Sequence, residues 1–170
     1  MIHDPALLDE LERLVTRPFY GRAWRHMFNG LDPQLSNTRG ARWNPLGTAA
    51  VYLSLESATA IAEADHSLNT QPVRPTPKSR ELYEVEIELQ RVLDIREEGV
   101  LERLGVDANA LRRHPPDECQ AVGGGAAWLD CDGLLVPSGR APGSNLVAFV
   151  DHMEPDATLT IIERTELPVE

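Results

Sequence analysis

The chain has 170 residues, of which 42% are hydrophobic and 25% charged, as expected for one globular domain with its own core. Its formal net charge of −11 argues against direct binding of nucleic acid, because displacing counterions from phosphates requires a basic surface. No apolar run approaches the roughly 20 residues that span a bilayer. The first residues lack the basic and apolar order of a signal peptide, so we expect a cytoplasmic protein without a membrane partner.

Arginines are concentrated in the N-terminal region, although the chain as a whole is acidic. Between Thr16 and Leu55 the only acid is Asp32. A basic region in an acidic chain suggests a local anionic ligand, and the planar guanidinium suits phosphate oxygens. The alternative is a set of scattered, solvated side chains, and charge alone favours that alternative. The segment contains Arg17, Arg22, Arg25, Arg39 and Arg42.

The N-terminal part is predicted to form a helix, a strand and a turn-rich loop. Leucines at helical spacing follow a favourable Asp-Pro start, so residues 1–18 are predicted to be an N-terminal helix ahead of a core of residues 19–165. Residues 21–28 are predicted to be a strand on which Trp24 and Arg25 point to opposite faces. The glycines and prolines that follow this strand predict a rim loop beside a site.

The stretch of residues 40–63 is the most informative part of the sequence. It is predicted to form a tight polar loop, then a short buried strand, then a helix that is capped by either Ser54 or Ser57. The loop presents Arg42 and Asn44, the strand carries Tyr52, and the helix carries Glu63. We therefore expect arginine, tyrosine and glutamate to line one pocket at a sheet edge.

The second half of the chain is predicted to alternate strands with short helices. Apolar and acidic residues alternate over residues 82–89, which predicts a half-buried strand, followed by a second extended segment at 92–94. Residues 66–79 contain three prolines and are expected to be irregular. A helix at 119–129 is expected to be interrupted by three glycines, which would be tolerated where a backbone or a ligand approaches closely. Other predicted elements are helices at 100–104 and 107–113 and strands at 133–136, 145–149 and 158–162.

These elements indicate a single α+β domain with central twisted sheets and short flanking helices. The two cysteines form neither a CxxC pair nor a disulfide framework, so reduced thiols are expected. No internal repeat or low-complexity segment interrupts the chain, which favours one domain over residues 1–170.

Most standard catalytic motifs are absent from the sequence. Neither GxxxxGK[ST] nor GxGxxG is present, and Ser138 does not lie in the GxSxG context of a hydrolase nucleophile. Glu63 and His66 are spaced like half of a di-iron site, but the second half is missing and no zinc-ligand set occurs, so no metal is expected. What remains is a set of arginines, a tyrosine, a glutamate without a paired acid, and a serine.

This set suits a substrate that carries its own leaving group, and cleavage of the nicotinamide–ribose bond of NAD is one such reaction. Arginines can bind the pyrophosphate, and an aromatic face can stack on the leaving ring. A carboxylate can stabilise the oxocarbenium-like ribose and hold a ribose hydroxyl. The residues alone leave this reaction as one option among several.

Five short motifs resemble, in the same order, those of the RES domain family, and they cover most of the chain. The resemblance implies a fold similar to ADP-ribosyltransferases and a toxin of a bacterial toxin–antitoxin pair, inhibited by an antitoxin with a helix-turn-helix-like domain. It also implies an enzyme that consumes NAD as its substrate, by hydrolysis, by phosphorolysis, or by transfer of ADP-ribose to a protein. The motifs are Trp24-Arg25-His26, Gly40-Ala41-Arg42-Trp43-Asn44-Pro45, Val51-Tyr52-Leu53-Ser54, Ala60-Ile61-Ala62-Glu63 and Gly133-Leu134-Leu135-Val136-Pro137-Ser138.

The same resemblance suggests a role for each candidate residue. Arg25 corresponds to the first arginine of the family, on the strand that binds NAD, and Arg42 to the loop arginine that grips phosphate. Tyr52 is expected to pack on nicotinamide or ribose, and Glu63 to be the catalytic carboxylate. The family's serine corresponds best to Ser138, with a polar residue near Gln120 as the other candidate. Trp24 and His26 stand where many members have other aromatic residues, and they are expected to contact the substrate together with Asn44.

Each candidate also has a purely structural interpretation. Arg25 would pair with an acid on the strand of residues 84–88, and Arg42 would brace its loop through backbone carbonyls. Tyr52 would be a core residue with a satisfied hydroxyl, Glu63 a solvated helix residue, and Ser138 a turn residue. At the level of function, the alternatives to an NAD-degrading toxin are an ADP-ribosyltransferase that modifies a protein and a binding module without turnover. The acceptor nucleophile, the antitoxin and the oligomeric state do not follow from the sequence.

Overall fold

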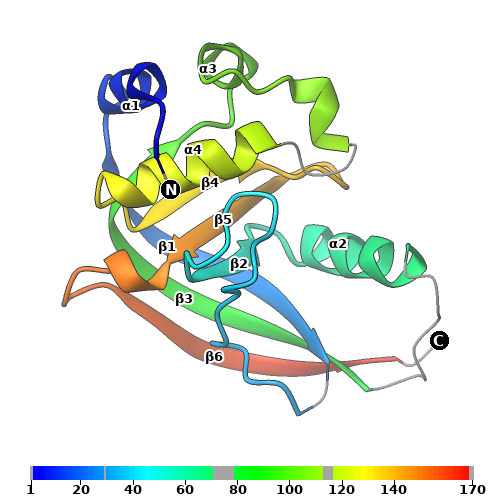
Figure 1. Ribbon diagram of the computed structural model, residues 1–170. Helices are drawn as coiled ribbons and strands as arrows, with labels where there is room; N and C mark the ends of the chain where they lie inside the picture. Colours follow the sequence, from blue (N-terminus) through cyan, green and yellow to red (C-terminus); the bar gives the residue numbers. More distant parts are fainter. Residues whose placement is uncertain (1, 29, 71–78, 113–116, 169–170) are drawn as a thin grey trace.

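The computed structural model describes residues 2–28, 30–70, 79–112 and 117–168. Helices α1, α3 and α4 lie over one side of the sheet, and α2 packs separately beside β1 and β2 (Figure 1). No helix in these ranges is long and apolar enough to cross a membrane. In chain order the elements are α1 (Pro5–Glu12), β1 (Arg17–Phe28), β2 (Ala50–Ser54), α2 (Ser57–Asn69), β3 (Arg80–Asp94), α3 (Glu98–Arg103), the 3₁₀ helix η1 (Ala108–Arg112), α4 (Asp117–Trp128), β4 (Gly133–Pro137), β5 (Ser144–Phe149), the 3₁₀ helix η2 (Val150–His152) and β6 (Thr158–Leu167).

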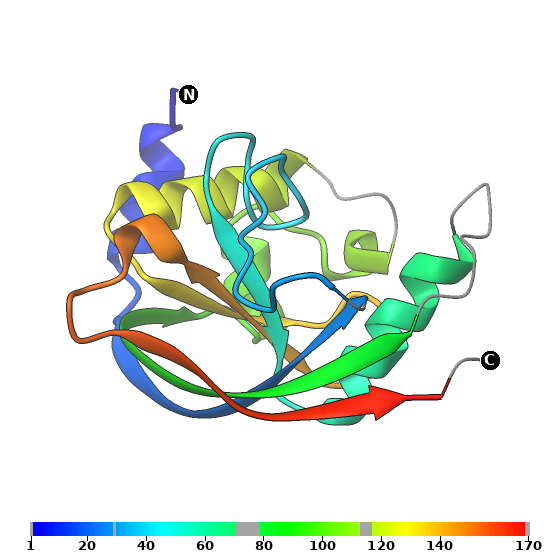
Figure 2. The same cartoon turned by 90° about the horizontal axis from the view of Figure 1, so that it is seen from below.

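The six strands form one sheet that closes on itself as a small barrel. The strand order is β1-β2-β5-β4-β3-β6, and β1 also pairs with β3, so five strands form a ring that β6 extends at the edge of β3. β1 and β3 pair over nearly their whole lengths, whereas β1 and β2 share the single pair Trp24–Ser54. β1, β3 and β6 run side by side on the side away from α4 (Figure 2). The predicted mixture of strands and short flanking helices is confirmed, but the expectation of more than one sheet is wrong, because the β1–β3 pairing joins all six strands.

Strand β3 changes its neighbour partway along, and this change explains a break in its sequence pattern. Its N-terminal part pairs with β6, and residues 92–94 pair in parallel with β4. At the changeover, the carboxylate of the buried Asp132 accepts hydrogen bonds from the backbone amides of Gln90 at 2.7 Å and Arg91 at 2.8 Å. The strand predicted at 82–89 and the segment predicted at 92–94 are therefore one continuous element.

Several boundaries differ from the predictions at exposed ends of elements. β1 begins earlier, at Arg17, and β6 ends later, at Leu167, because pairing with β3 continues past the buried residues. α1 ends at Glu12, so it does not fill the predicted 1–18 helix. α2 continues to Asn69, into the stretch expected to be irregular, and residues 71–78 of that stretch lie outside the described residues.

Buried apolar residues form two clusters, one on each side of the sheet. The interior of the barrel holds one cluster, which includes Leu146. The other packs α1, α3 and α4 on the outer faces of β2, β4 and β5, and includes Trp43 and Phe149. Cys119 and Cys131 are buried and unpaired, and burial raises the pKa of each thiol to about 11, so both stay protonated at neutral pH.

α4 is continuous, contrary to the interruption predicted at its three glycines. A Cβ on Gly123 would overlap the main-chain carbonyl oxygen of Trp43, whereas a Cβ on Gly124 or Gly125 would meet only side chains. Glycine therefore lets the helix lie directly against the backbone of the loop that carries Arg42. The closely approaching group at Gly123 is therefore a backbone segment, whereas Gly124 and Gly125 lie against side chains.

Candidate functional site

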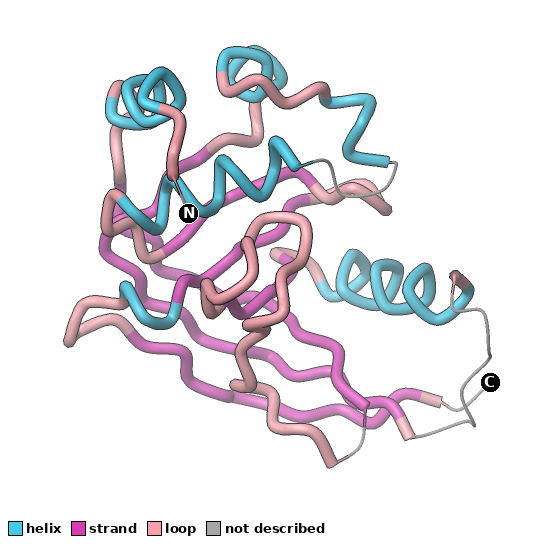
Figure 3. Tube along the Cα trace, viewed as in Figure 1, coloured by secondary structure: helices cyan, strands magenta, loops and turns pink. Residues whose placement is uncertain are grey.

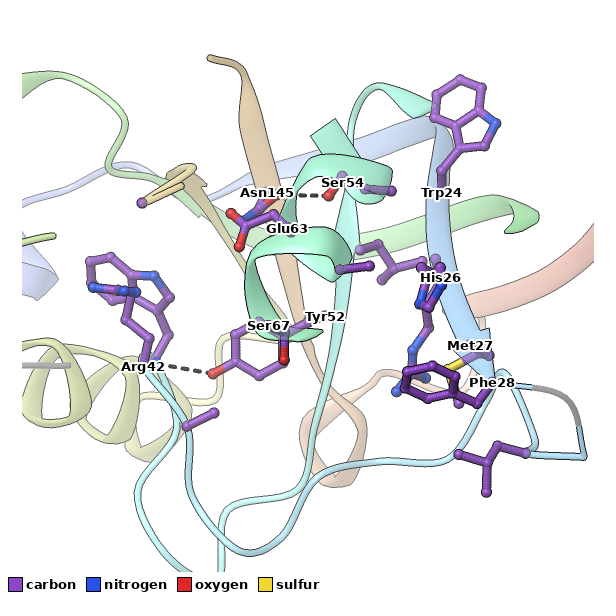
Figure 4. A pocket seen from close by; sticks show the side chains of 18 of the residues that line it. Trp24, His26, Met27, Phe28, Arg42, Tyr52, Ser54, Glu63, Ser67 and Asn145 are labelled. Atoms are coloured by element: carbon purple, nitrogen blue, oxygen red, sulfur yellow. Dashed lines mark hydrogen bonds between the residues drawn. The ribbon is translucent and has the colours of Figure 1, made fainter. Parts of the chain in front are cut away.

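β1 and β2 diverge from their single shared pair and border a cleft of about 500 Å³. Residues 24–28 of β1, loop residues 41–43, β2, α2 and the turn between β4 and β5 line it (Figure 4). The long loop between β1 and β2, drawn in pink, passes in front of the sheet and brings residues 41–43 to the cleft (Figure 3). Beyond the Trp24–Ser54 pair the two strands separate and leave room for side chains between them, so this seam of the barrel is the candidate site.

Glu63 points from α2 into this cleft and is bound through one of its carboxylate oxygens. Oε1 accepts a hydrogen bond from Ser138 Oγ and another from Asn145 Nδ2 at 3.1 Å. The Oγ of Ser54 donates in turn to Asn145 Oδ1 at 2.9 Å (Figure 4). Ala60 is buried one turn before Glu63, so the face of α2 that packs on the sheet also carries the carboxylate.

Arg42 faces the same cleft from the loop, and its guanidinium is incompletely paired. Nη1 is buried and has no hydrogen-bond partner within the described part of the chain. Burial lowers the pKa of Arg42 from its ordinary value, the charge of Arg140 lowers it further, and Glu63 acts in the opposite direction. A desolvated cation that lacks acceptors is well suited to bind an anion.

Tyr52 and Asn44 hold the loop in place through a closed set of hydrogen bonds. Asn44 is fully buried. Its Nδ2 donates to the carbonyls of Asn37 at 3.0 Å and Thr48 at 2.8 Å. The Tyr52 hydroxyl donates to Asn44 Oδ1 at 2.8 Å and accepts from the amide of Trp43 at 2.9 Å. Burial raises the pKa of Tyr52, so the hydroxyl stays protonated. The side chain of Tyr52 also lines the cleft.

Gln120 and Ser138 belong to different parts of the site. Gln120 Nε2 donates to the carbonyl of Ala41 at 2.9 Å and so braces the loop beside Arg42. Ser138 Oγ accepts from two backbone amides of its own turn, at 3.2 and 3.1 Å, and donates to Glu63. Of the two polar candidates, Ser138 is the one that contacts the carboxylate.

Arg25 lines the cleft, but its guanidinium is engaged by the loop that follows β1. One terminal nitrogen donates to the carbonyl of Pro33, and Nη2 donates to the carbonyl of Leu35 at 2.7 Å. Burial is the main reason that the pKa of Arg25 lies below its ordinary value. A different arginine of β1, Arg22, pairs with an acid of the 84–88 segment: its Nη1 lies 2.8 Å from Oε1 of Glu84 on β3. Arg25 therefore anchors the rim loop to β1.

His26 is held at the cleft by a row of polar groups. Arg80 Nε donates to His26 Nε2 at 2.9 Å, and Arg80 Nη2 lies 2.5 Å from Asp65 Oδ1. Burial lowers the pKa of His26, and the charge of Arg80 lowers it further. An imidazole nitrogen that accepts a hydrogen bond is unprotonated, so the ring is neutral. The ring meets Phe28 edge-on at 5.3 Å between centroids, and Trp24 lies further along β1 (Figure 4).

Ser54, Asn145 and Arg80 are site residues that the sequence interpretation did not assign. Ser54 was expected as one of two possible helix caps, but it is the last residue of β2, and the helix begins after Glu56. The available signal was a polar residue at the end of an otherwise apolar strand, which β2 and β5 both show. Their convergence becomes visible only through the pairing of these two strands.

The fold and the cleft together define an α+β barrel protein with a cleft along the seam between β1 and β2. A carboxylate held through one oxygen lies in this seam with an incompletely paired arginine and a row of aromatic rings. Within the described ranges, no group of three His, Cys, Asp or Glu residues is arranged to hold a metal ion.

The chain belongs to the RES domain family, whose model matches residues 11–170. It is similar to proteins named NAD(+) phosphorylase MbcT from Mycobacterium bovis and Mycobacterium tuberculosis, with 26% identity over 120 residues. The match covers 68% of this chain and spans 64% of the length of these relatives. The fold is similar to that in the crystal structure of the M. tuberculosis MbcT–MbcA toxin–antitoxin complex, with a TM-score of 0.83 and 23% identity, covering 96% of this chain and 93% of that chain.

Proposed function

We propose that this protein is the toxin of a bacterial toxin–antitoxin pair and degrades NAD by cleaving its nicotinamide–ribose bond. The observation that carries the proposal is the presence of Glu63 and the incompletely paired Arg42 in one cleft. Membership of the RES domain family and the similarity to proteins named NAD(+) phosphorylase support it. The proposal includes an ADP-ribosyltransferase-like arrangement, in which NAD lies along the open seam between β1 and β2.

Arg42 binds the NAD pyrophosphate, because its buried Nη1 gains an acceptor there. Arg25 contributes positive charge from β1 while its guanidinium also holds the rim loop. Tyr52, Trp24 and His26 surround the nicotinamide and ribose with ring faces.

Two residues act indirectly in this proposal, through the loop that carries Arg42. The side-chain amides of Asn44 and Gln120 donate hydrogen bonds to backbone carbonyls of the loop. We therefore assign them to holding the loop in its binding conformation, and a direct substrate contact is assigned to neither.

Glu63 is the catalytic carboxylate. The C1′–N bond of the nicotinamide riboside breaks, and its electron pair leaves with nicotinamide, which becomes neutral. The positive charge that develops on the ribose is stabilised by Glu63, which also accepts from a ribose hydroxyl. An oxygen of inorganic phosphate then bonds to C1′ and gives ADP-ribose phosphate; with water as the acceptor, one proton is released. Phosphate is the preferred acceptor in this proposal, because the curated relatives are named phosphorylases.

An antitoxin partner is part of the same proposal. One solved structure with a similar fold is a toxin–antitoxin complex. We infer a cognate antitoxin of helix-turn-helix type, with both proteins in the cytoplasm and without direct contact of this chain to nucleic acid or membrane. We also propose that residues 1–170 belong to one toxin domain, with residues 19–165 as its catalytic core.

The test is NAD turnover by the purified chain, with and without inorganic phosphate, followed by nicotinamide release and identification of the ribosyl product. We expect release that depends on phosphate and falls at least about 100-fold in Glu63→Gln. The matched control is Glu86→Gln, which changes an exposed carboxylate on β3 and should keep wild-type turnover.

Two outcomes would contradict the proposal. Absence of nicotinamide release with either acceptor would mean that the chain is a binding module without turnover. Full activity in Glu63→Gln would mean that another residue is the catalytic group. With labelled NAD and a cell lysate, a labelled protein band in place of free ADP-ribose phosphate would show transfer to a protein side chain.

A further inference from the structure

The Glu63 carboxylate is bound from one side, through two hydrogen bonds to the same oxygen. Oε1 accepts from Ser138 Oγ and from Asn145 Nδ2. In the described part of the chain, Oε2 receives no comparable hydrogen bond. A carboxylate held in this way has a defined rotation about its last bond, and it presents one free oxygen.

Both donors are fixed in direction by their other partners. A hydroxyl has one proton and two acceptor sites. Two backbone amides occupy the acceptor sites of Ser138 Oγ, so its proton goes to Glu63. An ionised carboxylate only accepts, so Asn145 must turn its NH₂ group toward Glu63 and its carbonyl toward Ser54, whose hydroxyl donates.

Ser54 and Asn145 are held rigidly by the sheet. They lie directly opposite each other on β2 and β5, and Ser54 is also opposite Trp24 on β1. Ser54 is only 5% exposed. A buried polar side chain costs free energy unless it is hydrogen-bonded, and the amide oxygen of the partly exposed Asn145 supplies the partner of the Ser54 hydroxyl. The three strands meet at the position from which the carboxylate is oriented.

We propose that Asn145, oriented by Ser54, is a positioning residue that fixes the Glu63 carboxylate and presents its Oε2 to the ribose of the substrate. This inference rests on the proposed cleavage of NAD and assigns the residues that prepare the carboxylate for it. Asn145 acts through Glu63. Its contribution is to orientation, and small errors of orientation are costly in the transition state.

The first test replaces the amide by a carboxylate of the same shape. In Asn145→Asp, an acceptor faces Oε1, and we expect kcat for NAD cleavage to fall about 100-fold while KM changes less than about threefold. The acid limb of the pH–rate profile should move to higher pH, because two adjacent carboxylates resist joint ionisation. Asn69→Asp adds the same charge at the exposed end of α2 and should keep wild-type kinetics. Wild-type kcat in Asn145→Asp would overturn the inference.

The second test asks whether Ser54 acts through its hydroxyl. Ser54→Ala removes the group that orients the amide, and we expect kcat about tenfold lower at a similar thermal midpoint of unfolding. Ser54→Thr retains a hydroxyl and should recover most of the loss. Equal losses in both variants would mean that Ser54 only fills space, which would overturn its orienting role.

The third test does not depend on turnover. In ligand-free crystal structures of the wild-type chain and of Asn145→Ala, we expect the Glu63 side chain to leave its wild-type rotamer in the variant. This result supports the positioning role even if the wild-type protein does not cleave NAD, in which case the proposed function alone fails. An unchanged carboxylate in Asn145→Ala would overturn the inference whatever the activity.

Discussion

Replacing Arg42 by methionine should stabilise the protein while it removes NAD turnover. The guanidinium carries a buried Nη1 without an acceptor in the described part of the chain, and Arg140 adds like charge. A buried unsatisfied donor costs about 1–3 kcal/mol. Methionine keeps the length and the apolar stem of the side chain. The variant loses the attraction to Glu63, which offsets part of the gain.

The net expectation for Arg42→Met is an unfolding free energy about 1–2 kcal/mol higher than that of the wild-type protein. For a chain of this size, 1 kcal/mol corresponds to a shift of about 2–4 °C in Tm. The measurements are urea and thermal unfolding at neutral pH without ligand. Arg39→Met is the matched control, because Arg39 is exposed on the same loop, and its stability should change by no more than about 0.5 kcal/mol.

A ligand-linked measurement separates the two roles of Arg42. ADP-ribose should raise the Tm of the wild-type protein by mass action and should raise that of Arg42→Met much less. The reasoning is refuted if Arg42→Met is less stable than the wild-type protein by more than about 0.5 kcal/mol, because the guanidinium would then contribute net stability without a ligand.

Two further predictions concern the loop and the histidine. Gly123→Ala places a methyl group against the carbonyl of Trp43, so it should lower the unfolding free energy by about 1–3 kcal/mol and reduce NAD turnover. The control is Gly99→Ala, which has open space around its Cβ and should cause neither loss. Equal stability of the two variants in urea unfolding would contradict this prediction. Burial, then Arg80, lowers the pKa of His26 from 6.5, so the unfolded chain binds more protons and stability falls as the pH drops below 6.5. Urea unfolding from about pH 5 to 8 should show a smaller loss in His26→Gln, and parallel curves would contradict the assignment.

Elements whose signals are local were predicted well. Asp4 was expected to begin the first helix, and its side chain accepts from the amide of Ala6 at 2.9 Å. The alternating residues 82–89 form part of β3, and their apolar members Val85, Ile87 and Leu89 are buried. The predicted interruption of α4 at its glycines was wrong. The low helix propensity of glycine can be read from the local sequence, whereas the contact of Gly123 with the backbone of Trp43 is made only in the folded chain.

The candidate site was predictable where its residues follow one another along the chain. Arg42, Tyr52 and Glu63 come from a continuous loop, strand and helix, and all three line one cleft. Ser54 and Asn145 are separated by 91 positions, so their hydrogen bond depends on the β2–β5 pairing and left no local trace. Nor did the sequence indicate which arginine side chains would be hydrogen-bonded and which would keep a donor unpaired within the described ranges.

By itself, the sequence determined the class of fold, the order of most strands and helices, and the family resemblance, because periodicity, caps and short motifs are properties of neighbouring residues. The tertiary structure decided that the sheet closes through β1 and β3 and opens between β1 and β2. It also decided that Arg25 is engaged by loop carbonyls while Arg42 keeps a buried donor without a partner in the described residues. Hydrogen-bond satisfaction depends on which distant groups are brought together, and only the folded chain specifies those neighbours.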